Sequence, residues 1–212
     1  MSGLFITMEG TDGSGKSTQI NMLKEYLEKK GYDVVFVREP GGTKIGEKIR
    51  EIILDPENNE MEHITEALLY ASSRAQLVNQ VILPALKNGK VVLCDRFVDS
   101  SIVYQGIARD LGEDTIAKIN RIATGGLKPD ITIFLNLSPE KAMERKKQQK
   151  ELDRLENEKQ YFYNQVYYGY KNLAKKNSKR IKTIDASKNI EDIYNDIITV
   201  IEKFIYTGGE IK

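Results

Sequence analysis

Gly10-Thr11-Asp12-Gly13-Ser14-Gly15-Lys16-Ser17 is the stretch that decides the fold, because it fits the pattern G-x-x-x-x-G-K-[ST] at every fixed position. A loop of this kind turns its backbone N–H groups inward around a phosphate, which requires glycines that carry no Cβ. The lysine reaches the β- and γ-phosphates of a nucleotide, and the serine after it can ligate Mg²⁺. The stretch therefore predicts a nucleotide-phosphate site at residues 10–17.

The sequence on either side of this loop supports that prediction. Residues 4–8, Leu-Phe-Ile-Thr-Met, indicate a buried strand, and Ile20, Leu23 and Leu27 recur at helical spacing after the loop. The phosphates would then lie at a helix N-terminus, next to its partial positive charge. A chance match is expected in on the order of 1% of chains of this length, given ordinary glycine usage, and the ordered flanks make chance rarer.

The composition predicts one globular domain over residues 1–206, with a short basic lid at about 145–156 and a frayed tail at 207–212. The net charge of +1 argues against a nucleic-acid partner, which would require a strong basic excess. No apolar run approaches the ~20 residues of a membrane span, and no signal-type segment begins the chain. Because Cys94 is the sole cysteine, no disulfide within the chain is possible, and we predict a cytoplasmic protein.

Strand and helix patterns alternate along the rest of the chain. Apolar β-branched runs predict strands at residues 4–8, 34–37, 91–95, 131–135 and 181–185. Helical spacing predicts helices at residues 16–30, 45–54, 64–87, 114–124 and 190–204, and further helices after Ser138 and through residues 162–173. This order predicts an α/β fold: a P-loop NTPase-type three-layer sandwich with a five-stranded parallel sheet flanked by helices.

The sequence also makes three detailed structural predictions. We expect Ile49, Ile52 and Ile53 to face the core, and Pro84 to bend the last turn of the helix over 64–87. The segment 97–106, which follows the third strand, is expected to be a loop that leaves the sheet's carboxyl edge.

Polar side chains follow the second and third strands, at the sheet edge where ligands bind in open α/β folds. Arg38-Glu39-Pro40-Gly41-Gly42 follows the second strand, and Asp95-Arg96-Phe97 follows the third, with Ser100, Ser101, Tyr104 and Gln105 beyond it. An acid that closes an apolar strand supplies the carboxylate near Mg²⁺ in P-loop folds. Tyr70 and Arg74 share a helix face; without further context they indicate an aromatic at the core edge beside a snorkelling arginine.

With these motifs the chain resembles the thymidylate kinases, nucleoside monophosphate kinases of the P-loop class. The resemblance covers nearly the whole chain and includes Arg154-Leu155-Glu156. The segments 38–42 and 95–106 are far more specific than the phosphate loop, which many functions share. The resemblance implies transfer of the γ-phosphoryl group of ATP to dTMP, giving ADP and dTDP for dTTP synthesis, with Mg²⁺ as the cofactor and a homodimer as the assembly.

The resemblance also implies roles for individual residues. Tyr70 would stack on thymine, Arg74 would bind a base oxygen, and Ser101 and Gln105 would face the remaining base edge. Arg50 and Arg96 would hold the monophosphate, Asp12 would meet the 3′-hydroxyl, and Glu39 would lie near sugar and metal. Tyr104 completes the dTMP set. The ATP set is Gly10, Asp12, Gly13, Ser14, Gly15, Lys16, Ser17, Thr18 and Ala186, the last bordering adenine; the metal set is Ser17 and Asp95.

The predicted catalytic residues are Lys16, Arg96 and one cation of the lid. Some family members carry an arginine inside the phosphate loop, but this sequence has Gly13 there, so it resembles the members whose catalytic cations lie in the lid. The candidates are Arg145, Lys147, Lys150 and Arg154. Arg154 is favoured, because a planar guanidinium suits phosphate oxygens better than an ammonium.

Two other functions remain open at this point. The first is a kinase for another nucleoside monophosphate, such as dUMP, CMP or AMP, since a single methyl group distinguishes thymine from uracil. The second is a nucleotide-dependent switch or binding module. That class of protein would give no role to Arg50, Arg74 and Arg96, and the sequence lacks a recognisable guanine-specificity motif.

Overall fold

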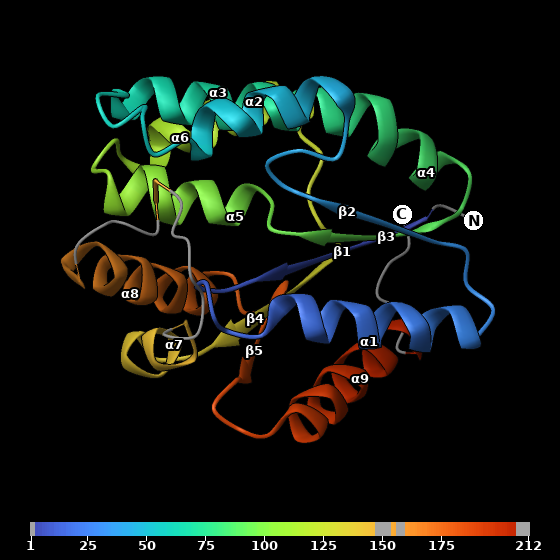
Figure 1. Cartoon of the computed structure of the whole chain (residues 1–212). Helices are drawn as coiled ribbons and strands as arrows, with labels where there is room; N and C mark the ends of the chain where they lie inside the picture. The colour runs from blue at the N-terminus through green and yellow to red at the C-terminus, as the bar shows by residue number, and fades with distance from the viewer. Residues whose placement is uncertain (1–2, 147–153, 156–159, 207–212) are drawn as a thin grey trace.

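A five-stranded parallel sheet forms the middle layer of the computed structural model, which describes residues 3–146, 154–155 and 160–206 (Figure 1). The strand order is β2-β3-β1-β4-β5, and all four pairings are parallel. The strands are β1 (Leu4–Glu9), β2 (Val34–Arg38), β3 (Val91–Asp95), β4 (Ile131–Asn136) and β5 (Ile181–Asp185). The predicted fold class is confirmed, whereas most of the predicted lid and the whole predicted tail lie outside the described residues.

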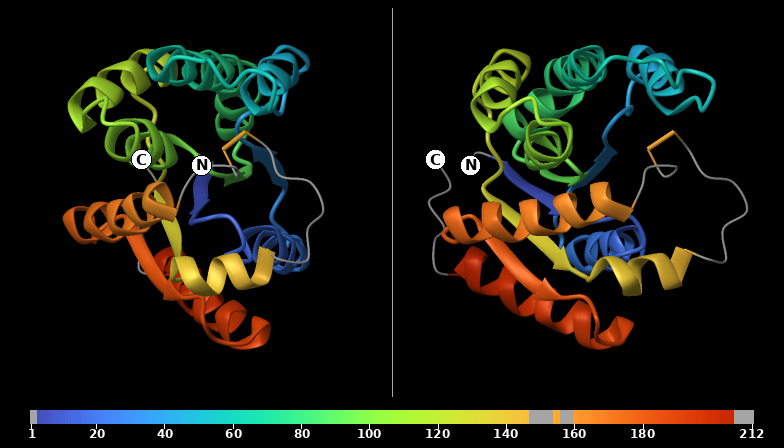
Figure 2. Two further views of the ribbon diagram at one scale, coloured as in Figure 1. Left: turned by 60° about the vertical axis from the view of Figure 1, so that its left-hand side comes forward. Right: turned by 90° about the vertical axis from the view of Figure 1, so that its left-hand side faces the viewer.

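Helices connect the strands and cover both faces of the sheet (Figures 1 and 2). Their bounds are α1 (Lys16–Lys29), α2 (Lys44–Leu54), α3 (His63–Leu77), η1 (Val78–Ile82), α4 (Leu83–Lys87), α5 (Val98–Ser101), η2 (Ile102–Ala108), α6 (Glu113–Thr124), α7 (Pro139–Lys146), α8 (Gln160–Lys176) and α9 (Ile190–Tyr206). The two elements named η are π-helical, so their turns are wider than those of an α-helix.

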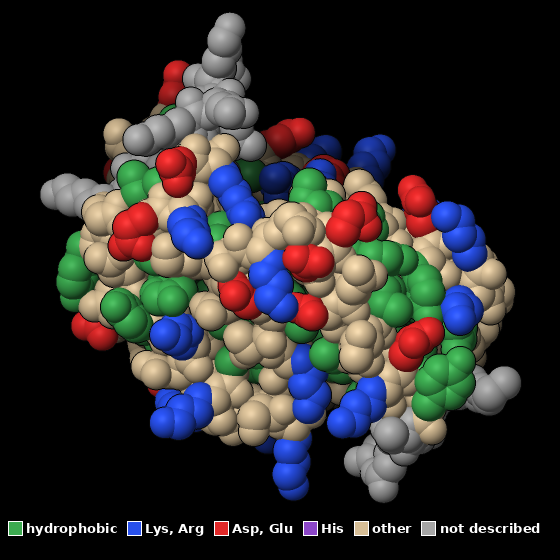
Figure 3. Space-filling view, turned by 90° about the horizontal axis from the view of Figure 1, so that it is seen from below, with side chains coloured by type: hydrophobic (Ala, Val, Ile, Leu, Met, Phe, Trp, Pro, Cys, Tyr) green, Lys and Arg blue, Asp and Glu red, His purple; other side chains and the backbone are tan. Residues whose placement is uncertain are grey.

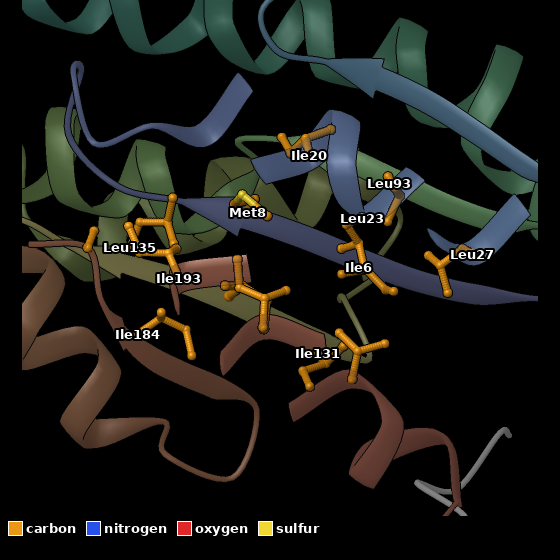
Figure 4. Close-up of a cluster of buried hydrophobic side chains, with 14 of the residues drawn as sticks. Ile6, Met8, Ile20, Leu23, Leu27, Leu93, Ile131, Leu135, Ile184 and Ile193 are labelled. Carbon is orange, nitrogen blue, oxygen red and sulfur yellow. The ribbon is translucent and has the colours of Figure 1, made fainter. Parts of the chain in front are cut away.

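The period-two pattern of the central strand decides which face each side chain joins. Ile6 and Met8 of β1 pack with Leu23 of α1 and Ile193 of α9 in one core cluster (Figure 4). Phe5, directly before Ile6 in sequence, packs instead on the opposite face with Phe97, in a ring contact of 5.0 Å. Because both faces are covered, β1 is apolar along most of its length, as expected for a central parallel strand.

On the face opposite α1 and α9, two further clusters fill the space under the helices. One joins β1, β2 and β3 to α3, η1 and α4, and the other joins β4 and β5 to η2 and α8. Tyr104 of η2 and Tyr170 of α8 belong to the second cluster, with ring centroids 6.2 Å apart. The helices that carry the predicted base-binding residues are therefore fixed directly to the sheet.

The prediction of a loop over residues 97–106 is wrong. The chain forms α5 and η2 there, and the wide turn is marked by the Arg109 N–H, which donates to the Tyr104 carbonyl at 2.9 Å. Val103, Tyr104 and Phe97 are buried against neighbouring elements, and this tertiary packing stabilises a helix that the local sequence does not signal.

The helix predicted over residues 64–87 is divided into α3, η1 and α4. Pro84 has no N–H with which to bond the carbonyl of residue 80, and the π-helical turn of η1 lies directly before it, with the Leu83 N–H donating to the Val78 carbonyl. The predicted inward orientation of Ile52 is also wrong, since this side chain is 48% exposed, whereas Ile53 is fully buried.

The surface mixes charges of both signs. Viewed from below, on the side of α1 and α9, Lys and Arg side chains are interspersed with Asp and Glu (Figure 3). Within residues 3–146, 154–155 and 160–206, no helix is long and apolar enough to cross a membrane.

Candidate active site

The loop between β1 and α1 has the geometry of a phosphate cradle. Gly10 has φ of +150°, and a Cβ there would lie 2.8 Å from Ser14 Oγ and 2.9 Å from the Leu135 carbonyl oxygen. Gly13 has φ of +80°, in the left-handed region that favours glycine. No side chain caps the N-terminus of α1, so the first N–H groups of this helix are available to an anion.

Lys16 is folded back over this loop. Its ammonium donates to the carbonyls of Gly10 at 3.2 Å and Thr11 at 3.1 Å, and the side chain is almost fully buried. Burial, and then the nearby Arg96 guanidinium, lower the pKa of Lys16 to about 8. A phosphate group at the loop would supply the negative charge that this buried ammonium requires.

Arg96 connects the phosphate loop to the end of β3. It has φ of +67°, a conformation that only a few per cent of non-glycine residues adopt. Its guanidinium donates to the Gly10 carbonyl and to Asp12 Oδ1, both at 2.6 Å, and lies over the Tyr104 ring. Backbone strain of this kind, in a residue that the surrounding contacts hold in place, is typical of functional sites.

A cleft bounded by α2, α3, α5 and η2, which we call the inner cleft, brings together all the residues predicted for dTMP. Its described lining consists of Asp12, Glu39, Pro40, Arg50, Leu54, Tyr70, Arg74, Arg96, Ser100, Ser101, Tyr104, Gln105 and Leu155. The Tyr104 hydroxyl is buried and has no hydrogen-bond partner among the described residues. The cleft thus combines aromatic and aliphatic walls with a few polar groups, as small-molecule sites do.

Arg74 lines the inner cleft and is 1% exposed. Its guanidinium donates to Glu39 Oε2 at 2.7 Å, Asn120 Oδ1 at 2.5 Å, the Phe97 carbonyl at 3.2 Å and Ser101 Oγ at 3.1 Å. A guanidinium has five N–H groups, so one Nη1 hydrogen has no acceptor among the described residues. The snorkelling arginine considered from the sequence is therefore excluded, because the charge is buried and fixed in place.

A second cleft, the phosphate cleft, lies over the phosphate loop. Its lining includes Gly13, Gly15, Lys16, Ser17 and Thr18 of the loop and Arg38, Asp95 and Arg145 from other segments. Four residues line both clefts, namely Asp12, Glu39, Arg50 and Arg96. The two clefts therefore meet, and an anion in one would face an anion in the other across two arginines.

The residues predicted for Mg²⁺ fit that ion. Asp95 Oδ1 is buried without a hydrogen-bond partner among the described residues, as is Glu39 Oε1, and Asp95 lines the phosphate cleft together with Ser17. The described part of the chain holds no group of three or more His, Cys, Asp or Glu side chains able to bind a metal alone. Mg²⁺ is usually held by one or two carboxylates, substrate phosphates and water, which matches this sparse set.

The two described lid arginines lie in different places. Arg145 lines the phosphate cleft and donates to the Ala186 carbonyl at 3.1 Å. Arg154 is buried at the far side of the inner cleft, where its guanidinium donates to the Ile53 carbonyl at 2.8 Å and to Glu66 Oε2 at 2.5 Å. In this conformation Arg145, rather than the favoured Arg154, is beside the phosphate loop. The other two candidates, Lys147 and Lys150, lie outside the described residues.

A third depression, the outer groove, lies beside the phosphate loop. It is lined by Gly13, Ser14, Gly15, Thr18, Gln19 and Arg145, and by residues 188–193. Ala186, which was predicted to border adenine, is fully buried behind the groove and contacts it through the hydrogen bond to Arg145.

Several polar residues of the site were missed from the sequence. Glu9, at the end of β1, accepts hydrogen bonds from the Phe97 N–H at 2.8 Å, Ser100 Oγ at 2.5 Å and the Tyr170 hydroxyl at 3.0 Å. Burial, and then the charge of Asp99, raise the pKa of Glu9 to about 7. Glu9 directly precedes the phosphate loop, and this position was a usable signal, whereas Tyr170 lies within the helix predicted through residues 162–173 and has no such signal.

Glu66 and Arg109 were missed for a different reason. Glu66 is fully buried in α3 and binds side chains from two other segments, Gln105 and Arg109 of the η2 region and Arg154. In the sequence, Glu66 follows the exposed stretch 62–65 and precedes the buried Ala67, and no local pattern distinguishes it.

Comparison with known proteins gives a consistent result. The family model for thymidylate kinase matches residues 8–197. A thymidylate kinase of Thermoanaerobacter sp. (strain X514) is 52% identical over 205 residues, covering 97% of this chain and 100% of that protein. One from Exiguobacterium sp. (strain ATCC BAA-1283 / AT1b) is 49% identical over the full length of both chains. The crystal structure of thymidylate kinase from Ehrlichia chaffeensis superposes with a TM-score of 0.76 at 32% identity, covering 95% of this chain and 99% of that one.

Proposed function

The chain belongs to the thymidylate kinase family, and on that premise we propose how its two clefts carry out the reaction. The enzyme transfers the γ-phosphoryl group of ATP to dTMP and releases dTDP and ADP, a step that supplies dTTP synthesis. The observation that carries the proposal is the meeting of the inner and phosphate clefts at Asp12, Glu39, Arg50 and Arg96.

ATP occupies the phosphate cleft and the outer groove. The N–H groups of the phosphate loop and the start of α1 bind the β- and γ-phosphates, and Lys16 leaves its carbonyl partners to neutralise them. The adenine lies in the outer groove, between Arg145 and the segment 188–193. Ser17 and Asp95 would hold Mg²⁺, which would supply positive charge to neutralise the triphosphate.

dTMP occupies the inner cleft. Tyr70 contacts the face of the thymine, and Arg74 donates its remaining N–H to a base oxygen, beside Ser101 and Gln105. Arg50 and Arg96 hold the 5′-phosphate, while Asp12 and Glu39 lie by the sugar. The rigid network around Arg74 keeps this donor fixed, so the cleft favours a base with an acceptor at that point.

Phosphoryl transfer requires the protein mainly to position the two substrates and to neutralise their negative charge. An oxygen of the dTMP phosphate attacks the γ-phosphorus, and the bond from that phosphorus to the β-phosphate oxygen breaks, with ADP as the leaving group. Arg96 touches both clefts and binds the group in transit, with Lys16 on the ATP side. We assign a lid cation, Arg154, to the same role, for which it has to leave Glu66.

A coupled ADP-release assay with dTMP, dUMP, UMP, CMP, AMP and GMP tests this function. We expect dTMP to be the best acceptor, with dUMP behind it by the roughly 10- to 200-fold that one methyl group in an apolar pocket provides. Another nucleotide as the best acceptor would replace dTMP as the substrate. Slow ATP hydrolysis unaffected by any monophosphate would instead indicate a nucleotide-dependent switch.

We also propose a cytoplasmic homodimer. Support for the dimer comes from exposed apolar side chains on α2 and α3, namely Ile45, Ile52, Ile64 and Leu68, each more than 40% exposed. Patches of this kind mark protein contacts. Light scattering coupled to size exclusion tests the assembly, and a monomer at micromolar concentration would refute it. Support for the compartment comes from Cys94, the sole cysteine of the sequence, which is buried and free, so no disulfide within the chain is possible.

A further inference from the structure

A buried carboxylate lies behind the base-reading end of the inner cleft and does not line it. Glu66 is 0% exposed, and its Oε1 accepts a hydrogen bond from Gln105 Nε2 at 2.9 Å. The Gln105 side chain is itself 1% exposed and lines the inner cleft. Glu66 therefore contacts Gln105, which lines the cleft, but Glu66 itself does not line it.

Two arginines keep this carboxylate ionised in this conformation, and Arg109 remains its partner when Arg154 leaves for the transferred group. Arg109 approaches Glu66 Oε2 at 3.2 Å, and Arg154 donates to the same oxygen at 2.5 Å, each guanidinium being almost fully buried. Burial alone would raise the pKa of Glu66, but Arg109, Gln105 and Arg154 together lower it below the ordinary value. An ionised carboxylate can only accept hydrogen bonds.

This chemistry fixes the orientation of the Gln105 amide. A glutamine carboxamide has one end that donates and one that accepts, and only the donating NH₂ group can bond to a carboxylate. Nε2 must therefore face Glu66, and Oε1, at the other end of a side chain that lines the inner cleft, is left for a ligand. The reverse orientation would place two acceptors against each other in a buried site.

We propose that Glu66 is a positioning residue for base selectivity, which holds Gln105 with its carbonyl oxygen toward the base. An acceptor at that point pairs with the N3–H of thymine and repels the N3 lone pair of cytosine. The inference rests on the proposed function, because it takes the occupant of the inner cleft to be a pyrimidine nucleotide. It extends that function by assigning a cause to the selection of a keto pyrimidine.

The experiment compares kcat/KM for dTMP and dCMP in the full-length protein. In Glu66→Gln the new amide can accept from Gln105 or donate to it, so both orientations of Gln105 become available. We expect the dCMP-to-dTMP ratio of kcat/KM to rise at least about tenfold, since an enforced polar mismatch supports discrimination of that size or larger. Glu62→Gln, one turn earlier on an exposed position, is the matched control and should leave the ratio unchanged.

Two further variants separate positioning from a merely structural role. Glu66→Asp keeps an ionised acceptor, so it should lower turnover of dTMP yet preserve the ratio. In a Gln105→Ala background, adding Glu66→Gln should change the ratio less than about twofold, because the residue through which Glu66 acts is gone. A tenfold ratio change in that background, an unchanged ratio in Glu66→Gln, or a raised ratio in Glu66→Asp would each overturn the inference.

Failure of the proposed function would look different. A wild-type enzyme that does not phosphorylate dTMP at all would refute that function before any variant is tested.

Should Glu66→Gln not fold, NMR of the wild-type protein labelled with ¹⁵N-glutamine replaces it. One Nε2 proton of Gln105, identified by its absence in Gln105→Ala, should exchange slowly with solvent with and without dTMP. Fast exchange in the dTMP complex would overturn the inference.

Discussion

The Arg96 guanidinium donates to Asp12 Oδ1 at 2.6 Å, so the residue after β3 is bonded directly to the phosphate loop after β1. These two side chains line both clefts, and each has a further contact with the loop or its lysine. Donor and acceptor phosphates are therefore positioned by one connected set of charges. The consequences can be measured residue by residue.

Lys16→Ala and Arg96→Ala should each lower kcat by 10²-fold or more. Both cations face the transferred group, and loss of one preorganised electrostatic partner has about this effect in other enzymes. Steady-state kinetics with saturating ATP and dTMP provide the test. Lys29→Ala and Arg121→Ala, which remove exposed cations of α1 and α6, are the controls. Near-normal turnover in either active-site variant would refute the role of that residue.

Arg154→Ala should lower kcat more than it raises the KM for ATP. The expected contact of Arg154 with the transferred phosphoryl group exists only during transfer, when the residue has left Glu66. Arg145→Ala should show the opposite split, mainly a raised KM for ATP, because Arg145 already lines the phosphate cleft and outer groove. An Arg154→Ala effect confined to KM would assign the lid role to another cation.

ATP binding should take up protons above pH 8. The pKa of Lys16 is lowered to about 8 in the free protein, so above that pH the free amine is largely neutral. The bound triphosphate stabilises the charged ammonium and so raises the pKa of Lys16. ATP binding is therefore accompanied by uptake of a proton between pH 8 and 10, and by no uptake at pH 6.5, where Lys16 is already charged. Titration calorimetry in buffers of different ionisation enthalpy measures the uptake. Equal uptake in Lys16→Met would attribute it to another group.

Glu9→Gln should gain stability over the wild type as pH rises from 4.5 to 7. The pKa of Glu9 is raised from 4.5 to about 7 in the folded protein. Between these two pH values the Glu9 carboxyl ionises in the unfolded chain but stays protonated in the folded one, so the wild type loses stability as pH rises. The difference corresponds to at most about 3 kcal/mol and levels off above pH 7. Urea unfolding at pH 5, 6, 7 and 8 measures it, and a difference independent of pH would contradict the assignment.

The sequence predicted the features of the fold and site that short stretches encode. The phosphate loop, the five strands and the acid at the end of β3 follow from local patterns, and the structure places Arg50, Tyr70, Arg74 and Gln105 in one cleft. The features that were not predicted depend on contacts between segments that are far apart in the sequence. The helical form of 97–106 needs burial against α6 and α8, and the Glu66 cluster joins residues up to 88 positions apart.

The positive φ of Arg96 has a consequence for how this enzyme tolerates change. Glycine normally weakens a folded chain relative to alanine, but at φ of +67° the order reverses, since a left-handed backbone disfavours a Cβ by about 1–2 kcal/mol. Arg96→Gly should consequently melt at a higher temperature than Arg96→Ala, although both lack the guanidinium. The wild-type protein accepts this backbone strain at Arg96 because the guanidinium bonds Gly10 and Asp12, so the strain is the cost of placing a cation between the two clefts.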